Sequence, residues 1–345
     1  MYQLCMDIET DVRWLIQQAM TSQRQQEVHR LPANVKEILR HLQHACEQCE
    51  HAVERRSILS ELKAQLRNVM TLDHAPNSGH SPMVLYGEAG VGKSTIMAQL
   101  HQRLAQWFGS DCVRVTRFAA LTSKSMNLYD LLLSVCEQIA AVYGIHLPRD
   151  LDQKPMLKLA ATFQKLLRKI SDHPMAFQRP LFILLDSLDD LSRLYNAHNP
   201  AWLPQTCPPH VYIIVSCRAQ ACSLYTRLRT LLKVTDSFIK VEGFSPTSAA
   251  KYVDAYLSSH GRTLTSEQRQ TLLNMSHGAG HSPMYMSLLL SQAKAWDSLF
   301  APSELQLGKT ISAAIAHVFD SLCDKHGRNF VAFTFAYIFV SKGQL

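Results

Sequence analysis

Eight consecutive residues, Gly87-Glu-Ala-Gly-Val-Gly-Lys-Ser94, have the composition of a loop that binds phosphate. They match the pattern G-x-x-x-x-G-K-[ST], and they lie between a short apolar run and an amphipathic segment, the strand and helix that the pattern requires. Glycines let consecutive backbone N–H groups turn toward phosphate oxygens, and the N-terminus of the helix adds a favourable field. Lys93 would reach the terminal phosphates, and Ser94 would give its hydroxyl to Mg²⁺. The residues expected to hold ATP or GTP are Gly87, Glu88, Ala89, Gly90, Val91, Gly92, Lys93, Ser94 and Thr95.

Carboxylates gather after a second apolar run, Leu181 to Leu185. Asp186 closes this run, and Asp189 and Asp190 follow three and four residues later. Ligands of open α/β sheets bind beyond the carboxyl ends of the strands, so these carboxylates are placed to act on a bound nucleotide. We predict that Asp186 holds Mg²⁺ together with Ser94, and that either Asp189 or Asp190 orients an attacking water. The last two could instead begin a loop or cap a helix.

Arg218 follows a third apolar run, Val211 to Val215. It would approach the terminal phosphate if its strand neighbours the strand of Asp186, and a charge-assisted hydrogen bond would then report hydrolysis. An arginine at a strand end is also an ordinary surface residue. The adjacent Cys217 could be a reactive thiol beside a positive charge, although a buried cysteine at a strand end is the commoner case.

Short apolar runs alternate with amphipathic segments from Met83 to about residue 242, the pattern of a parallel sheet covered by helices on both faces. Helical spacing of apolar residues also precedes this region, at Leu59, Leu62, Leu66 and Met70, and follows it after Gly243. The expected fold is therefore α/β, of the P-loop NTPase type. The expected domains are a helical lead-in (1–75), a nucleotide-binding domain (76–242), a helical lid (243–303) and the start of a further domain (304–345).

Composition narrows the class of protein. A chain of 345 residues with 47% hydrophobic residues can bury a large core, and its net charge of +7 comes from scattered residues, which argues against a nucleic-acid partner. Nine irregularly spaced cysteines and no cleavable signal segment predict reduced thiols and a cytoplasmic location. No apolar run reaches the roughly 18 residues that span a bilayer, so no membrane partner is expected. The apolar run from Val331 to Val340 lies close to the last residue, which suggests that the chain is cut inside a domain.

Histidines and cysteines crowd together at His41, His44, Cys46, Cys49 and His51. A Cys-x-x-Cys pair with neighbouring histidines can bind zinc, but no second pair of matching spacing follows. We therefore favour polar and small residues on a helix over a metal site.

Several separate stretches resemble the NACHT group of P-loop ATPases, and more closely the animal NACHT proteins that carry WD repeats. The resemblance is carried by the following stretches: Gly87 to Ser94, Arg117-Phe118, Leu131 to Ile139, Leu185 to Ser192, Trp202-Leu-Pro204, Ile213 to Arg218, Gly261 to Gln268 and Ser282-Pro-Met-Tyr285. It implies a switch between ADP-bound and ATP-bound states, with Mg²⁺, and Pro283 in contact with the base. It also implies that residues 304–345 begin a winged-helix domain. Two departures are Ser187, where many members have glycine, and Gly280-His-Ser-Pro283, which is one residue longer than the common Gly-x-Pro.

These observations favour an ATP-binding regulatory switch of a signalling or scaffold protein, an enzyme only in the sense of a weak ATPase. The alternative is a scaffold that has lost hydrolysis and keeps nucleotide as structural support. A DNA-associated ATPase is disfavoured by the missing basic surface pattern. The resemblance further implies protein partners bound through C-terminal repeats and an oligomer that depends on nucleotide.

Overall fold

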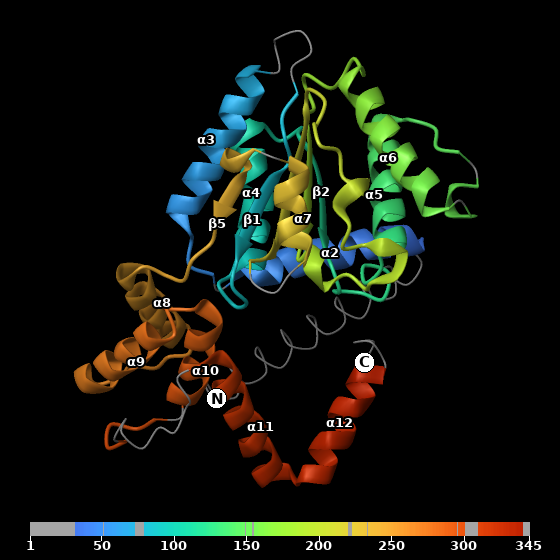
Figure 1. The fold of residues 1–345 in the computed structure, drawn as a ribbon. Helices are drawn as coiled ribbons and strands as arrows, with labels where there is room; N and C mark the ends of the chain where they lie inside the picture. Colours follow the sequence, from blue (N-terminus) through green and yellow to red (C-terminus); the bar gives the residue numbers. More distant parts are fainter. Residues whose placement is uncertain are drawn as a thin grey trace, which may run out of the picture.

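The computed structural model of the chain describes residues 32–50, 52–72, 79–148, 150–153, 155–219, 223–232, 234–294, 296–300 and 310–340. Within these residues the strands form one parallel five-stranded sheet with the order β2-β3-β4-β1-β5 (Figure 1). The strands are β1 (Met83–Gly87), β2 (Val113–Phe118), β3 (Leu181–Asp186), β4 (Val211–Arg218) and β5 (Phe238–Lys240). β1, β3 and β4 match the apolar runs of the sequence, and β2 matches the alternation of Val113 and Val115 with polar residues. β5 is a short strand that the sequence did not predict.

Strand order brings the predicted site residues to one edge of the sheet. β4 lies between β1 and β3, and in this register Gly87 is opposite Arg218 while Leu185, one residue before Asp186, is opposite Val215. Because all five strands are parallel, their carboxyl ends share this edge. The condition set for Arg218, that its strand neighbours the strand of Asp186, is therefore met.

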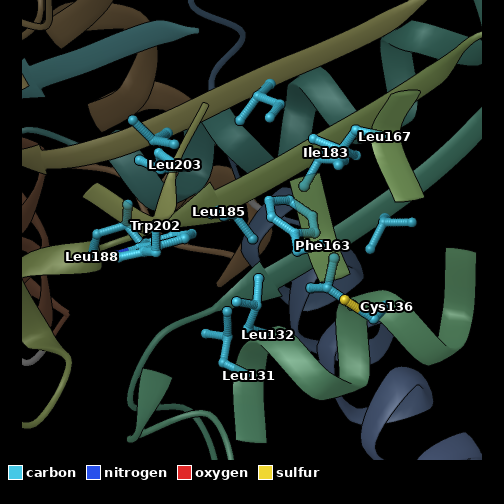
Figure 2. Packing of buried hydrophobic residues seen from close by; sticks show 14 of the residues in the cluster. Leu131, Leu132, Cys136, Phe163, Leu167, Ile183, Leu185, Leu188, Trp202 and Leu203 are labelled. Carbon is cyan, nitrogen blue, oxygen red and sulfur yellow. The ribbon is translucent and has the colours of Figure 1, made fainter. Parts of the chain in front are cut away.

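Helices cover both faces of the sheet, as the alternating pattern predicts (Figure 1). One face carries α5 (Leu128–Tyr143), α6 (Met156–Ser171) and α7 (Ser223–Leu232), and the other carries α3 (Arg56–Leu72) and α4 (Lys93–Phe108). Figure 2 shows α5 side chains, among them Leu132 and Cys136, packed near Phe163 of α6 and Leu185 of β3. Burial of these apolar stripes on an apolar sheet supplies the main driving force for this layer. Short 3-10 helices connect the layers at Leu151–Gln153, Leu188–Asp190, Leu194–Asn196, Pro200–Trp202 and Thr235–Ser237.

The lid consists of α8 (Pro246–Ser259), α9 (Ser266–Gly278) and α10 (Pro283–Ala293), which share their own apolar cluster. Helix α9 starts at a capping box, in which Thr265 and Gln268 satisfy each other's backbone N–H groups. The lid is followed by α11 (Ile311–His326) and α12 (Arg328–Val340), which extend as a V away from it (Figure 1). In the part of the chain that the structure describes, no helix combines the length and the apolar character needed to cross a bilayer.

Apart from His51, the His/Cys cluster lies on helix α2 (Ala33–Glu50). It consists of residues on a helix, as expected, but one of its histidines has a structural role that the sequence did not predict. His41 is fully buried: its Nδ1 accepts from the backbone N–H of Phe118 (3.1 Å), and its Nε2 contacts the carboxylate of Glu37 (3.2 Å). Burial lowers the pKa of His41, so the ring is neutral and donates its Nε2–H to Glu37. Burial alone would raise the pKa of Glu37, but hydrogen bonds from His41 and the Thr122 hydroxyl outweigh it and leave the pKa below its usual value. His51 lies outside the described residues.

This buried network generates a stability prediction. Replacing His41 with alanine leaves the Phe118 N–H and the Glu37 carboxylate short of a partner, so we expect the free energy of unfolding to fall by about 2–4 kcal/mol. Chemical denaturation followed by circular dichroism measures it. Gln43→Ala, which removes an exposed side chain of the same helix bonded to Glu47, should change the free energy by about 0.5 kcal/mol or less. Equal losses in the two variants would show that the network does not stabilise the fold.

Candidate functional site

The P-loop, residues Gly87 to Ser94, connects β1 to α4 at the carboxyl edge of the sheet. Gly90 has φ 76°, a left-handed conformation that side chains rarely adopt. A Cβ atom at Gly90 would also lie 2.8 Å from the Cβ of Met284, a residue of the lid. Glycine is therefore required at position 90 for two reasons: the left-handed backbone of the turn and the close approach of the lid.

Lys93, the first residue of α4, is only 8% exposed. Its Nζ donates to the backbone oxygens of Gly87 (2.9 Å) and Glu88 (2.8 Å), so its ammonium group lies inside the turn of the P-loop. Burial lowers the pKa of Lys93, while the carboxylates of Asp189 and Asp186 oppose this effect. A phosphate in the turn would replace backbone carbonyl partners with charged oxygens, which are stronger acceptors for an ammonium group.

Asp186 ends β3 and is 2% exposed. Its carboxylate accepts hydrogen bonds from the hydroxyls of Ser216 (2.5 Å) and Ser187 (3.0 Å). Burial raises the pKa of Asp186, and the side chains of Ser216, Ser94 and Ser187 act in the opposite direction. The two predicted metal ligands, Ser94 and Asp186, are thus close enough to interact.

Ser187 has φ 54° and ψ 46°, which is left-handed backbone. Glycine, which the resemblance implies at this position, would adopt this conformation without steric cost. Here the strain is offset locally: the Ser187 N–H donates to Ser216 Oγ (2.8 Å), and its hydroxyl donates to Asp186.

Arg218 is paired with both remaining carboxylates of the site. Its guanidinium donates to Asp189 through Nε and to Asp190 through Nη2 (2.7 Å), and its backbone N–H donates to Asp189 (3.1 Å). The Asp189 side chain is 4% exposed, whereas about half of the Arg218 side chain is exposed. The structure therefore brings together Asp189 and Asp190, the two alternatives for orienting water, and links both to Arg218, the predicted sensor.

A cavity of about 690 Å³ opens over the P-loop. Among the predicted residues it is lined by Ala89, Gly90, Gly92, Lys93, Ser94, Thr95, Asp189, Asp190, Arg218 and Pro283. Gly87, Glu88, Val91 and Asp186 are not among its lining residues. A cavity of this volume suits a nucleotide-sized ligand.

The sequence did not point to two other walls of this cavity. Helix α2 contributes His44 and Gln48, and the Gln48 side-chain oxygen accepts from the hydroxyl of Thr95 (3.1 Å). The lid contributes Tyr252 besides Pro283, Met284, Ser287 and Leu288. The only signal in the sequence was polar residues on a face of the α2 helix, and surface helices carry such residues whether or not they bind a ligand.

A smaller cavity of about 190 Å³ adjoins the first and shares Gln48, Gly92, Thr95, Tyr252 and Pro283 with it. Its other walls are Phe244 and the segment between α2 and α3. Pro283 lies against the P-loop, since a Cβ at Gly92 would be 3.6 Å from its Cγ. The arrangement provides one cavity over the phosphate loop and a smaller one beside it.

The residues present fit a nucleotide with Mg²⁺. A serine hydroxyl and a carboxylate supply the hard oxygen ligands that this ion prefers, and they meet where the P-loop enters its helix. Among the described residues, no group of three His, Cys, Asp or Glu side chains is arranged to hold a metal by protein ligands alone. Mg²⁺ is usually held by one or two protein ligands together with phosphate oxygens, so this ligand count suits it.

Comparison with known proteins identifies the family of the chain. The family model "NACHT domain" matches residues 81–260, more than half of the chain. NACHT domain- and WD repeat-containing protein 1 of mouse is 30% identical over 283 residues, which cover 82% of this chain and 18% of the relative. Human NACHT and WD repeat domain-containing protein 2 is 30% identical over 293 residues, covering 82% of this chain and 16% of the relative. The chain thus spans less than a fifth of the length of these relatives.

Solved structures with a similar course of the chain include Cdc6p of Pyrobaculum aerophilum and PCH-2 of C. elegans. Cdc6p has a TM-score of 0.43 and 13% identity, over 70% of this chain and 62% of its own. PCH-2 has a TM-score of 0.47 and 12% identity, over 80% of this chain and 72% of its own. The sheet order and the P-loop of this chain define its fold as that of a P-loop NTPase. Together with the family match, they show that the chain belongs to the NACHT domain family of P-loop NTPases.

Proposed function

We propose that this chain is the ATP-binding switch module of a larger signalling or scaffold protein, with slow hydrolysis at most. The observation that carries the proposal is that one cavity is walled by both the P-loop and the lid. A ligand there touches two structural units at once, so its binding free energy depends on how they are placed. Protein partners bound through repeats, and a nucleotide-dependent oligomer, remain further parts of this proposal.

Direct contacts between loop and lid support a switch. The carbonyl oxygen of Gly90 accepts from the hydroxyl of Ser282 (3.0 Å) and from the backbone N–H of Met284 (3.1 Å). In this proposal the N–H groups of the P-loop and Lys93 bind phosphate, while the carbonyl oxygen of Gly90 is bonded to the lid. A change in the loop on binding or losing a phosphate would act on the lid through these two hydrogen bonds.

The residues divide the work of binding as follows. P-loop N–H groups and Lys93 would hold the phosphates, and Ser94 with Asp186 would hold Mg²⁺, which supplies charge neutralisation at the phosphate oxygens when bound. Asp189 or Asp190 would orient water, but only after Arg218 releases that carboxylate. The exposed guanidinium of Arg218 could then turn toward the terminal phosphate.

The pairing of Arg218 with both carboxylates also favours the second candidate, a scaffold in which nucleotide is structural. Carboxylates occupied by a guanidinium are poor at orienting water. In that case Mg-ATP would stabilise the fold by binding to it, without turnover.

Lys93→Ala is expected to abolish nucleotide binding, because the ammonium group is the charged partner of the phosphates. Isothermal titration with Mg-ATP and Mg-ADP measures the affinity. Lys158→Ala, at an exposed lysine of α6 that does not line the cavity, is the matched control and should bind like the wild type. Wild-type affinity in Lys93→Ala would refute nucleotide binding at this loop.

Hydrolysis decides between the switch and the scaffold. For the switch we expect phosphate release at or below about 0.01 per second, the range of unassisted switch NTPases, and a clear reduction in Asp189→Asn or Asp190→Asn. For the scaffold we expect Mg-ATP to raise the melting temperature with no phosphate released. Turnover faster than about 1 per second would contradict both.

A further inference from the structure

Arg55 lies outside every motif of the sequence, yet its side chain contacts two separate segments beside the site. Its Nη2 donates to the backbone oxygens of Glu242 (2.5 Å) and Gly243 (3.1 Å), and its Nη1 donates to that of Val91 (3.4 Å) in the P-loop. The guanidinium carbon lies 5.0 Å from the centre of the Phe244 ring, in a cation–π arrangement. One side chain thus joins the P-loop to the segment that leads from the sheet into the lid.

The position of Arg55 is fixed from the opposite side as well. It lies in the short segment between α2 and α3, and its backbone N–H donates to the side-chain oxygen of Gln99 (3.4 Å). The amide nitrogen of Gln99 donates in turn to the backbone oxygen of Val53 (3.2 Å). Gln99 belongs to α4, the helix that begins with Lys93, so the segment is attached to the helix that the P-loop starts.

The chain that Arg55 holds is itself packed tightly against the lid. A Cβ at Gly243 would lie 1.9 Å from the carbonyl oxygen of Gly280, so only glycine permits this approach. The next backbone N–H, that of Phe244, donates to the oxygen of His281 (2.9 Å). This turn leads directly into Ser282 and Pro283, and the Ser282 hydroxyl bonds to Gly90.

These contacts close a ring. Starting from the P-loop at Val91, the path runs through Arg55 to residues 242–244, then to the turn at residues 280–282, and returns to the P-loop at Gly90. Arg55 is 9% exposed and its partners are backbone oxygens, which require a donor but supply no countercharge. A buried guanidinium with several directed donors suits such a role better than a single-point ammonium.

We propose that Arg55 is a positioning residue that holds the lid against the P-loop and thereby sets the lifetime of a bound nucleotide. The inference rests on the proposed nucleotide binding. Arg55 also borders the smaller cavity beside Pro283, so movement of its side chain would open one wall of the site. The exit of a nucleotide then requires the Arg55 contacts to break or to shift.

The test uses Arg55→Ala in the full chain with two measurements. In stopped-flow displacement of a fluorescent ADP analogue, we expect dissociation about tenfold faster, the change that corresponds to one charge-assisted hydrogen bond of about 1.4 kcal/mol. In hydrogen exchange of the protein without nucleotide, the amides of Phe244 and Met284 should exchange faster, while those of central β3 and β4 keep the wild-type rate.

Three variants serve as controls. Arg56→Ala removes the neighbouring arginine, whose side chain is 85% exposed and pairs with Glu54, and should match the wild type in both measurements. Leu62→Ala lowers stability through a buried residue of α3 and should leave nucleotide dissociation unchanged. Arg55→Lys, which keeps the charge without the planar fork, should lie between wild type and Arg55→Ala, and it replaces the alanine variant if that one does not fold.

The proposal is overturned if Arg55→Ala, or Arg55→Lys in its place, leaves both the dissociation rate and the Phe244 and Met284 exchange at wild-type values. It is also overturned if Leu62→Ala accelerates dissociation equally, because the effect would then be one of general stability. Absence of nucleotide binding by the wild type would refute the proposed function instead. The exchange measurement would still decide whether Arg55 holds the lid.

Discussion

Parallel pairing of β4 between β1 and β3 is the constraint on which the site depends. It brings the end of the P-loop strand, the carboxylate of Asp186 and the guanidinium of Arg218 to one edge of the sheet, although these residues are far apart in sequence. The pairing is stabilised by apolar side chains on both faces, which are buried by helices on either side. Buried apolar residues of the strands stabilise the sheet, and this stable sheet holds the polar residues at its carboxyl edge.

Local pattern was sufficient to predict four strands, the covering helices α3, α4, α5 and α6, and the P-loop, but not helix α7. The spacing of apolar residues and the length of apolar runs were the informative features. Leu59, Leu62 and Leu66 are buried as their spacing predicts, and Leu181 to Leu185 form a fully buried strand. Strand β5 was not predicted, because three residues are too few to show the alternation of apolar and polar residues that indicates a strand. The left-handed backbone of Ser187 was not predicted either, because a serine residue does not by itself indicate a positive φ.

The sequence could not show which distant segments meet over the P-loop. Helix α2 places His44 and Gln48 in the cavity, and the lid places Tyr252 there, but each of these residues is ordinary for a helix surface. The contacts of Gly90 with Ser282 and Met284 join residues more than 190 positions apart. Such contacts follow from tertiary packing, and no periodicity in the chain encodes them. The domains expected at 1–75 and 243–303 thus supply walls of a site whose centre lies in the sheet.

The charged side chains of Lys93, Asp186, Asp189, Asp190 and Arg218 all have partners supplied by the chain. Lys93 is bonded to two carbonyls, Asp186 accepts from hydroxyl groups, and Arg218 is shared by Asp189 and Asp190. A triphosphate with Mg²⁺ would have to exchange these internal partners for its own oxygens. The net free energy of binding would be the difference between the interactions within the protein and those with the nucleotide. This difference is smaller than the energy of either set of interactions. If the chain is the proposed switch, modest energy at the lid, through Gly90 or Arg55, would be enough to shift the balance between them.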